Sequence, residues 1–183
     1  MRYAGIIKND VVNGYDVCVS FWCQGCTFEC EGCHNPQTWD FNGGIEGEED
    51  NIINEIISDI SKNGIQRNFS ILGGEPLCDK NVDFVYKLIQ EVRKVYPDIK
   101  IFCWTGYIWE GIFSSATLDW LEYQTFQDLR KEIVKSIDVL IDGRYEKTLR
   151  DITLPFRGSS NQRVIDVKKS LKTGHIELYN EEK

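Results

Sequence analysis

The sequence of 183 residues predicts an α/β fold, in which a mainly parallel sheet is covered by helices and forms a partial, open β/α barrel. Segments rich in β-branched and aromatic residues alternate along the chain with segments whose apolar residues recur at helical spacing. Only about four or five such β/α units fit into the chain, which is too few for a closed barrel. The barrel is therefore expected to leave one side open, where a macromolecular substrate can enter.

The first predicted elements are a pair of strands and an amphipathic helix. Arg2–Ile7 and Val17–Trp22 are β-like, and the turn signal Asn13–Gly14 between them predicts that they pair. In Glu48–Lys62 the isoleucines recur at helical spacing and a glycine follows, so this segment is predicted as a helix. Between the second strand and this helix lies a loop that contains four cysteines.

The alternation of strands and helices continues after the first helix. The strand Asn68–Leu72 precedes a helical stripe that begins at Val82 and ends near Pro97. Loops that leave parallel strands meet at the carboxyl ends of those strands, so functional residues are expected there. The later predicted elements are the strand Ile99–Trp104, a helix within Thr117–Ser136, the strand Ile137–Ile141, and two weaker β-like segments, Arg163–Val167 and His175–Tyr179.

The composition predicts one globular domain over residues 1–183 and excludes some partners. Hydrophobic residues make up 42% of the chain and charged residues 27%, the mixture of an ordinary folded protein. The 29 acidic side chains outnumber the 21 basic ones, and no Lys/Arg cluster stands out, so nucleic acid is not an expected partner. Met1–Asn9 is too short for a signal peptide or a membrane span, which favours a cytoplasmic protein without membrane contact.

Seven cysteines in a chain of this kind indicate reduced thiols or a metal centre rather than disulfides, because cytosolic thiols are kept reduced. Cys26, Cys30 and Cys33 have the spacing Cys-x-x-x-Cys-x-x-Cys on one short loop. Three thiolates so placed can occupy three corners of a [4Fe-4S] cluster and leave the last iron without a protein ligand. The spacing therefore predicts a cluster with one open iron.

Two other metal sites could use the same cysteines. A structural zinc site would need Cys23 or His34 as a further ligand, but its ligands are usually divided between two separate knuckles. An electron-transfer cluster could use all four cysteines, but the ferredoxin spacing is Cys-x-x-Cys-x-x-Cys, which this loop lacks. Cys23 follows directly after a predicted strand, so we favour a buried residue over a ligand at this position.

The cysteine motif followed by Gly73–Pro76 resembles the radical S-adenosylmethionine superfamily. The resemblance implies a partial, open β/α barrel of the radical S-adenosylmethionine type, and S-adenosyl-L-methionine as cosubstrate. Many members have an aromatic residue where this chain has Gly32, a departure that matters little if the main chain makes the contact. The residues implied to bind the cosubstrate are Gly32, Cys33 and His34 on the adenosine side, and Gly73, Gly74 and Glu75 at the amino group.

The cysteine loop is most similar to that of enzymes that activate glycyl-radical proteins, including Cys33–Pro36 and Thr38–Asp40. Within this group, the chain resembles the activating proteins of anaerobic ribonucleoside-triphosphate reductases. The further segments that carry this resemblance are Met1–Ile6, Trp104–Glu110, Asp138–Tyr145 and Phe156–Arg163.

The resemblance implies a radical S-adenosylmethionine oxidoreductase that activates its partner by generating a glycyl radical. The cosubstrate would be cleaved reductively, and the resulting 5'-deoxyadenosyl radical would abstract hydrogen from a glycine near the carboxyl end of the reductase. The implied partners are that reductase and a low-potential electron donor such as a flavodoxin or a ferredoxin. The alternatives are an activase of another glycyl-radical enzyme, another radical enzyme, and a zinc-binding module without catalysis.

The later motifs also have purely structural interpretations. Trp104 and Trp109 are candidates for the core, and Asp142–Gly143 is a candidate turn. Arg157 and Arg163 are expected either in structural ion pairs or in solvent. Arg157 has an additional interpretation, because a guanidinium in a loop rich in Gly, Ser and Asn is suited to binding the partner's backbone or carboxylates.

Overall fold

A computed structural model describes residues 1–114 and 121–180. Within these residues, one mixed sheet has the strand order β3-β1-β2-β4-β5-β6-β7. Its four central strands, β2, β4, β5 and β6, are parallel, and the remaining pairs are antiparallel. The predicted α/β class with a mainly parallel sheet is therefore confirmed, and the sheet is open. The strands are β1 Arg2–Asp10, β2 Cys18–Cys23, β3 Ile45–Glu46, β4 Asn68–Gly73, β5 Ile101–Trp104, β6 Val139–Asp142 and β7 Arg163–Asp166.

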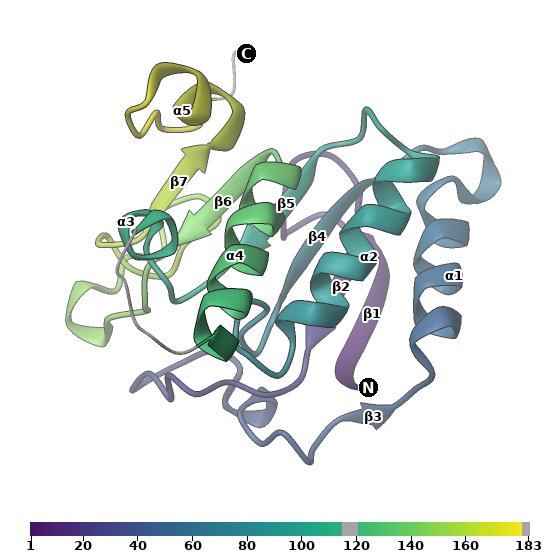
Figure 1. The fold of residues 1–183 in the computed structure, drawn as a ribbon, viewed down its shortest axis with the longest axis horizontal. Coiled ribbons are helices and arrows are strands. Elements are labelled where there is room, and N and C mark those ends of the chain that lie inside the picture. The colour runs from purple at the N-terminus through teal and green to yellow at the C-terminus, as the bar shows by residue number, and fades with distance from the viewer. Residues whose placement is uncertain (115–120, 181–183) are drawn as a thin grey trace.

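Three helices, α1, α2 and α4, cover one face of the sheet and lie side by side in Figure 1. Of the predicted helix within Thr117–Ser136, the first four residues lie outside the described part of the chain, and α4 accounts for the rest. No helix of residues 1–114 and 121–180 has both the length and the hydrophobicity to cross a membrane. The α-helices are α1 Glu49–Ile60, α2 Val82–Val95, α3 Trp109–Phe113, α4 Leu121–Ser136 and α5 Val167–Thr173, and the 3-10 helices are Pro36–Thr38, Lys62–Gly64 and Lys147–Leu149.

The two faces of the sheet carry two separate hydrophobic clusters. Side chains alternate between the faces along a strand, so Ile101 and Cys103 of β5 pack under the helices, while Phe102 and Trp104 point the other way. This second face, here called the inner face, is covered by loops. Tyr15 from the β1–β2 loop and Phe156 from the loop after β6 pack on it, with their ring centroids 4.6 Å apart. The helices α1, α2 and α4 therefore lie on the outer side, and loops cover the inner face.

The tail of the chain differs from the prediction. Arg163–Val167 was expected as a strand, and β7 pairs antiparallel with β6 as the edge strand. The helix α5 follows it at once and was not predicted, because a seven-residue helix carries little periodicity. The predicted strand His175–Tyr179 forms only an isolated bridge to β7, between Ile165 and Leu178.

The pairing of β2 with β4 decides where the functional motifs lie. The two strands are parallel and in register over their whole length, from Cys18 beside Asn68 to Cys23 beside Gly73. Both strands therefore end at the same level of the sheet. As a result, the cysteine loop that leaves β2 and the glycine motif that leaves β4 begin side by side.

Candidate functional site

A cavity of about 520 Å³ lies at the carboxyl ends of the four parallel strands and extends along the inner face. The loops that leave β2, β4, β5 and β6 all contribute to its wall, as expected for a sheet of this kind. It continues past Trp22 and Trp104 to Val12 and Phe156. The residues that these four loops contribute include Cys26, Cys30, Cys33, His34, Gly73, Gly74, Glu75, Thr105, Gly106, Gly143, Arg144 and Tyr145.

The cysteine loop, residues 24–35, is held by hydrogen bonds to the segment that follows it. The backbone N–H groups of Gly25 and Cys26 donate to the carbonyl oxygens of Thr38 and Trp39. The side-chain amide of Gln24, which is buried, donates to two further carbonyl oxygens, those of Gln37 and Asp40. These hydrogen bonds hold the first residues of the cysteine loop against residues 37–40.

The three predicted ligands Cys26, Cys30 and Cys33 are free thiols of intermediate exposure that all line the cavity. Burial raises the pKa of Cys26 and of Cys30, and backbone N–H groups oppose this: those of Phe28 and Glu29 at Cys26, and that of Tyr145 at Cys30. The N–H of Asn35 donates to the sulfur of Cys33 at 3.4 Å. Sulfur atoms that accept backbone hydrogen bonds in this way are typical of the thiolates that hold iron–sulfur clusters.

This donor set fits a [4Fe-4S] cluster. Each thiolate of a cubane binds a different iron, so the sulfur atoms surround the cluster and do not meet at one point. In residues 1–114 and 121–180, no three Cys, His, Asp or Glu side chains are close enough to hold a single metal ion. Cys26, Cys30 and Cys33 would hold the cluster, and the cavity beside them leaves room for a ligand of its remaining iron.

Cys23, unlike these three thiols, does not line the cavity. It is the last residue of β2, is fully buried, and belongs to the cluster under the helices together with Cys103 and Leu77. Burial raises its pKa well above the ordinary value. Cys23 is thus a core residue in this structure, and the alternatives that use it as a fourth ligand would require it to leave the core.

Phe28 fixes the part of the cysteine loop between the first two ligands. Its ring lies against Gly106, where a side-chain Cβ would be only 2.3 Å from the ring. It packs edge-on against Tyr107, with 5.0 Å between the ring centroids, and Arg144 lies over its face at 4.2 Å. The loops that follow β5 and β6 therefore both contact the cysteine loop through the side chain of Phe28.

The glycine motif approaches the cysteine loop as closely as main chain allows. Gly74 donates its N–H to the carbonyl of Cys23, and Glu75 donates to the carbonyl of Gly25. A Cβ on Gly74 would lie 2.3 Å from the Gly25 carbonyl oxygen, so only glycine fits there. Gly73 has φ of +105°, a conformation that favours glycine. Gly73 and Gly74 therefore allow the main chain of the glycine motif to contact the main chain of the cysteine loop directly.

The carboxylate of Glu75 is buried and occupied by donors from the protein. Its Oε1 accepts from the N–H of Leu77 at 2.9 Å and the hydroxyl of Thr105 at 2.7 Å, and its Oε2 accepts from the N–H of Gly106 at 2.7 Å. Burial raises the pKa of Glu75 to about 7, and these hydrogen bonds oppose that rise. In the structure, Glu75 fastens the β5 loop to the β4 loop.

The other residues implied to bind the cosubstrate fall in two groups. Gly73, Gly74, Cys33 and His34 line the cavity, and the His34 ring lies 5.9 Å from that of Tyr145. Gly32 does not line it; it has φ of +75° and faces the side chains of Tyr145 and Lys147.

Two buried polar residues that support the site were missed in the sequence. Asn81, which precedes α2, donates its side-chain N–H groups to the carbonyl oxygens of Gln24 and Glu75, so it ties both loops to the helix. Arg130 of α4 donates to the carbonyl of Leu77 at 2.7 Å and pairs with Asp79. Nothing local marks either residue, because their partners lie far away along the chain.

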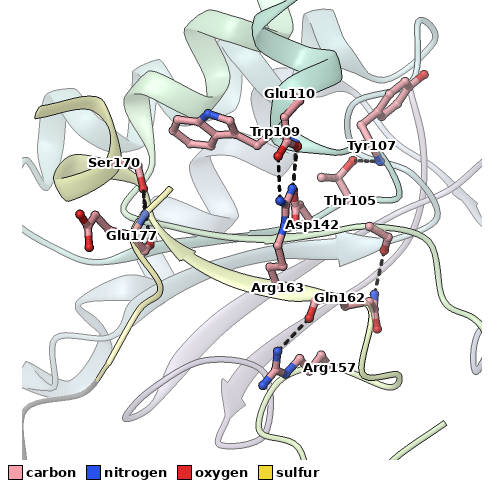
Figure 2. Close-up of polar contacts among 11 residues, drawn as sticks. Thr105, Tyr107, Trp109, Glu110, Asp142, Arg157, Gln162, Arg163, Ser170 and Glu177 are labelled. Carbon is pink, nitrogen blue, oxygen red and sulfur yellow. Dashed lines mark hydrogen bonds and ion pairs between the residues drawn. The ribbon is translucent and has the colours of Figure 1, made fainter. Parts of the chain in front are cut away.

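The motifs Trp104–Glu110, Asp138–Tyr145 and Phe156–Arg163 meet in an ion-pair cluster (Figure 2). Arg163 of β7 donates from Nε and Nη2 to both oxygens of the fully buried Asp142 at the end of β6, and also pairs with Glu110 of α3. The N–H of Trp109 completes the contacts of Asp142 at 2.8 Å. For Arg163, the interpretation as part of a structural ion pair therefore holds, whereas Asp142, predicted in a turn, is the last residue of β6.

We expect Glu110→Gln to lower the free energy of unfolding by less than about 1 kcal/mol at neutral pH, since this carboxylate is 56% exposed. The hydrogen bonds from Arg163 lower the pKa of Glu110 from 4.5 to about 2. A lowered pKa stabilises the fold above pH 4.5, and this contribution is lost as the pH falls towards about 2. Urea unfolding of both proteins should show a difference that vanishes in acid; a difference independent of pH would contradict this assignment.

The residues after Asp142 form a loop organised by Gln162. Its side-chain Oε1 accepts from the N–H of Gly158 at 2.9 Å, and its Nε2 donates to the carbonyl of Gly143, also at 2.9 Å. The backbone carbonyl of Gln162 accepts from Arg157 at 2.8 Å (Figure 2). Arg157 itself lines the cavity.

Comparison with known proteins agrees with this site. Residues 12–165 match the family model described as a 4Fe-4S single cluster domain, which places the three-thiol loop in the class of single-cluster iron–sulfur domains. Similar proteins in Escherichia coli, Pasteurella multocida and Haemophilus influenzae are 37%, 33% and 34% identical, over 88% of this chain and 96%, 95% and 96% of theirs. Each is named anaerobic ribonucleoside-triphosphate reductase-activating protein. The chain belongs to the family of anaerobic ribonucleoside-triphosphate reductase-activating proteins.

Proposed function

We propose that this protein activates an anaerobic ribonucleoside-triphosphate reductase as a radical S-adenosylmethionine enzyme. When bound by Cys26, Cys30 and Cys33, a reduced [4Fe-4S] cluster would supply the electron that splits S-adenosyl-L-methionine into methionine and a 5'-deoxyadenosyl radical, which takes hydrogen from a glycine of the reductase. The observation that carries the proposal is the register of β2 and β4, which puts the three thiols and Gly73–Glu75 on one cavity.

The residues of the chain position the cosubstrate and exclude water from it. Gly73 and Gly74 present main-chain atoms without side chains, so the amino group of the cosubstrate can approach them. Glu75 acts through the main chain, because its carboxylate is used to fix the β4 and β5 loops. Cys33 and His34, which line the cavity, provide the adenosine side, and the main chain of Gly32 supports them from outside the lining. This chemistry needs no acid or base from the protein.

The open sheet supports assignment of the whole chain, residues 1–183, as one partial β/α barrel of the radical S-adenosylmethionine type. Helices cover its outer face, and the cavity extends along the inner face, which is covered only by loops within the described residues. The glycine-bearing carboxyl-terminal segment of the reductase would enter from this side. A low-potential flavodoxin or ferredoxin would supply the electron.

Anaerobic reconstitution tests this function directly. The protein is loaded with iron and sulfide, reduced, and mixed with S-adenosylmethionine, and 5'-deoxyadenosine is then measured. Adding the reductase should produce the electron paramagnetic resonance doublet of a glycyl radical, which should be absent when the cosubstrate is omitted. A chain that takes up only zinc would overturn the proposal. Cleavage of the cosubstrate without a radical on the reductase, but with one on a different glycyl-radical enzyme, would support the alternative activase.

We expect Glu75→Gln to destabilise the fold by roughly 1–3 kcal/mol and to weaken cosubstrate binding more than cluster uptake. An amide NH₂ would face a fixed N–H donor, at Leu77 or at Gly106. Thr105→Val removes only one donor and serves as the control, with a smaller expected effect. Urea unfolding, iron content and the Kd for S-adenosylmethionine measure the three quantities. An unchanged Kd for S-adenosylmethionine in Glu75→Gln would show that Glu75 does not support cosubstrate binding.

A further inference from the structure

Arg157 lines the cavity, and one nitrogen of its guanidinium has no hydrogen-bond partner in the described residues. A guanidinium binds a carboxylate most strongly through two parallel N–H groups, such as Nε and Nη2. Arg163 shows the filled arrangement in this protein, because its Nε and Nη2 donate to the two oxygens of Asp142. In Arg157, Nη1 donates to the Gln162 carbonyl, while Nε is buried and has no hydrogen-bond partner in the described residues.

The orientation of Arg157 is fixed before any ligand binds. Gln162 anchors its Nη1 and at the same time fastens the loop, through Gly158 on one side and Gly143 on the other. Figure 2 shows the guanidinium held at Gln162, apart from the cluster of Arg163 and Asp142. A side chain held in this way loses little freedom when a ligand arrives, which favours binding.

No carboxylate of the described residues pairs with the guanidinium of Arg157. Glu75 lines the same cavity, but its oxygens accept three hydrogen bonds from other groups. Asp151 is within electrostatic range of Arg157, but it accepts from Thr153, and no ion pair joins the two among residues 1–114 and 121–180. Arg157 thus lines the cavity without an ion-pair partner among the described residues, in a chain with net charge −8.

We propose that Arg157 is a carboxylate-binding residue of the cavity, which accepts its ligand across Nε and Nη2 as Arg163 accepts Asp142. The inference rests on the proposed function, which brings two carboxylates to this cavity: that of the amino-acid part of S-adenosylmethionine, and those of the reductase segment. Both sources share the chemistry that the edge recognises. Binding measurements distinguish them.

The test compares wild type with Arg157→Met and Arg157→Lys, all loaded with cluster. One arm measures the Kd for S-adenosylmethionine and for its decarboxylated analogue. The other measures the Kd for a synthetic peptide of the glycine-bearing segment, and for the same peptide with its carboxylates converted to amides. Arg150→Met is the matched control, since Arg150 is exposed on the same loop, carries the same charge and does not line the cavity.

Removing the carboxylate from the ligand that Arg157 binds should raise the Kd of the wild type. This rise should be about tenfold or more larger than the rise that the same removal causes in Arg157→Met. Arg157→Lys should lie between them, because lysine keeps the charge and loses the two-point contact, and Arg150→Met should behave as wild type. Equal losses in wild type and Arg157→Met for both ligand pairs would overturn the proposal. Cluster uptake and cosubstrate cleavage by the wild type report separately on the proposed function; a chain that takes up no cluster overturns both.

Discussion

Replacing Cys26, Cys30 or Cys33 with alanine should abolish cluster binding, so that iron and sulfide content fall to the level of an empty protein. With two remaining thiolates, the cluster would be anchored at two corners instead of three, and a second iron would lack a protein ligand. All three side chains line the cavity and are only partly buried, so the change should leave the fold intact. Iron and sulfide analysis of anaerobically reconstituted protein, with its visible absorption spectrum, measures the loss.

The matched control is Cys23→Ala, three residues before the first ligand. Cys23 packs under the helices, so its replacement should cost about 1 kcal/mol of stability and leave the iron content near that of the wild type. Loss of the cluster in Cys23→Ala as complete as in Cys30→Ala would show that four thiolates bind it. The hypothesis of an iron without a protein ligand would then be wrong, and so would the proposed cleavage of the cosubstrate at that iron.

Gly74→Ala should be nearly as damaging, although alanine adds only one methyl group. The new Cβ would lie 2.3 Å from the carbonyl oxygen of Gly25, and this neighbour is main chain that cannot rotate away. The β2 and β4 loops must separate, at a cost of roughly 1–3 kcal/mol for an overpacked site. Because Gly25 directly precedes Cys26, the cluster and the cosubstrate pocket would shift relative to each other, and cosubstrate cleavage should fall roughly a hundredfold.

Gly5→Ala provides the comparison for this change. Gly5 lies in β1, where an added Cβ meets nothing within 4 Å, so neither stability nor cleavage should change much. Denaturant unfolding and the rate of 5'-deoxyadenosine release measure both variants. If Gly74→Ala bound its cluster and cleaved the cosubstrate like Gly5→Ala, the close contact of the two loops would not be needed for the reaction.

The elements that the sequence predicted are those with a local signature. The strands β1, β2, β4, β5 and β6 and the helices α1 and α2 have clear signatures, whereas the two-residue strand β3 has none. The rule that parallel strands end together predicted that the loops carrying Cys26–Cys33 and Gly73–Glu75 would meet. The sequence could not predict that the Glu75 carboxylate accepts hydrogen bonds from the N–H groups of Leu77 and Gly106, because these contacts depend on the register of β4 and β5. Local patterns do not encode such distances.

The supporting polar residues escaped prediction for the same reason. Asn81 follows the glycine motif and looked like an ordinary residue before a helix, yet its amide reaches Gln24, 57 positions earlier in the chain. Arg163 was equally consistent with solvent, and only the antiparallel pairing of β6 and β7 brings it to Asp142. Partners distant in sequence, rather than unusual residue types, define these contacts.

The ladder between β2 and β4 runs unbroken to the last residue of each strand, and backbone hydrogen bonds extend it into both loops. The first residues of both loops are therefore continuous with the hydrogen bonds of the sheet. We expect a protein that has lost its iron to oxygen to keep this backbone arrangement and to bind a cluster again when iron and sulfide are supplied.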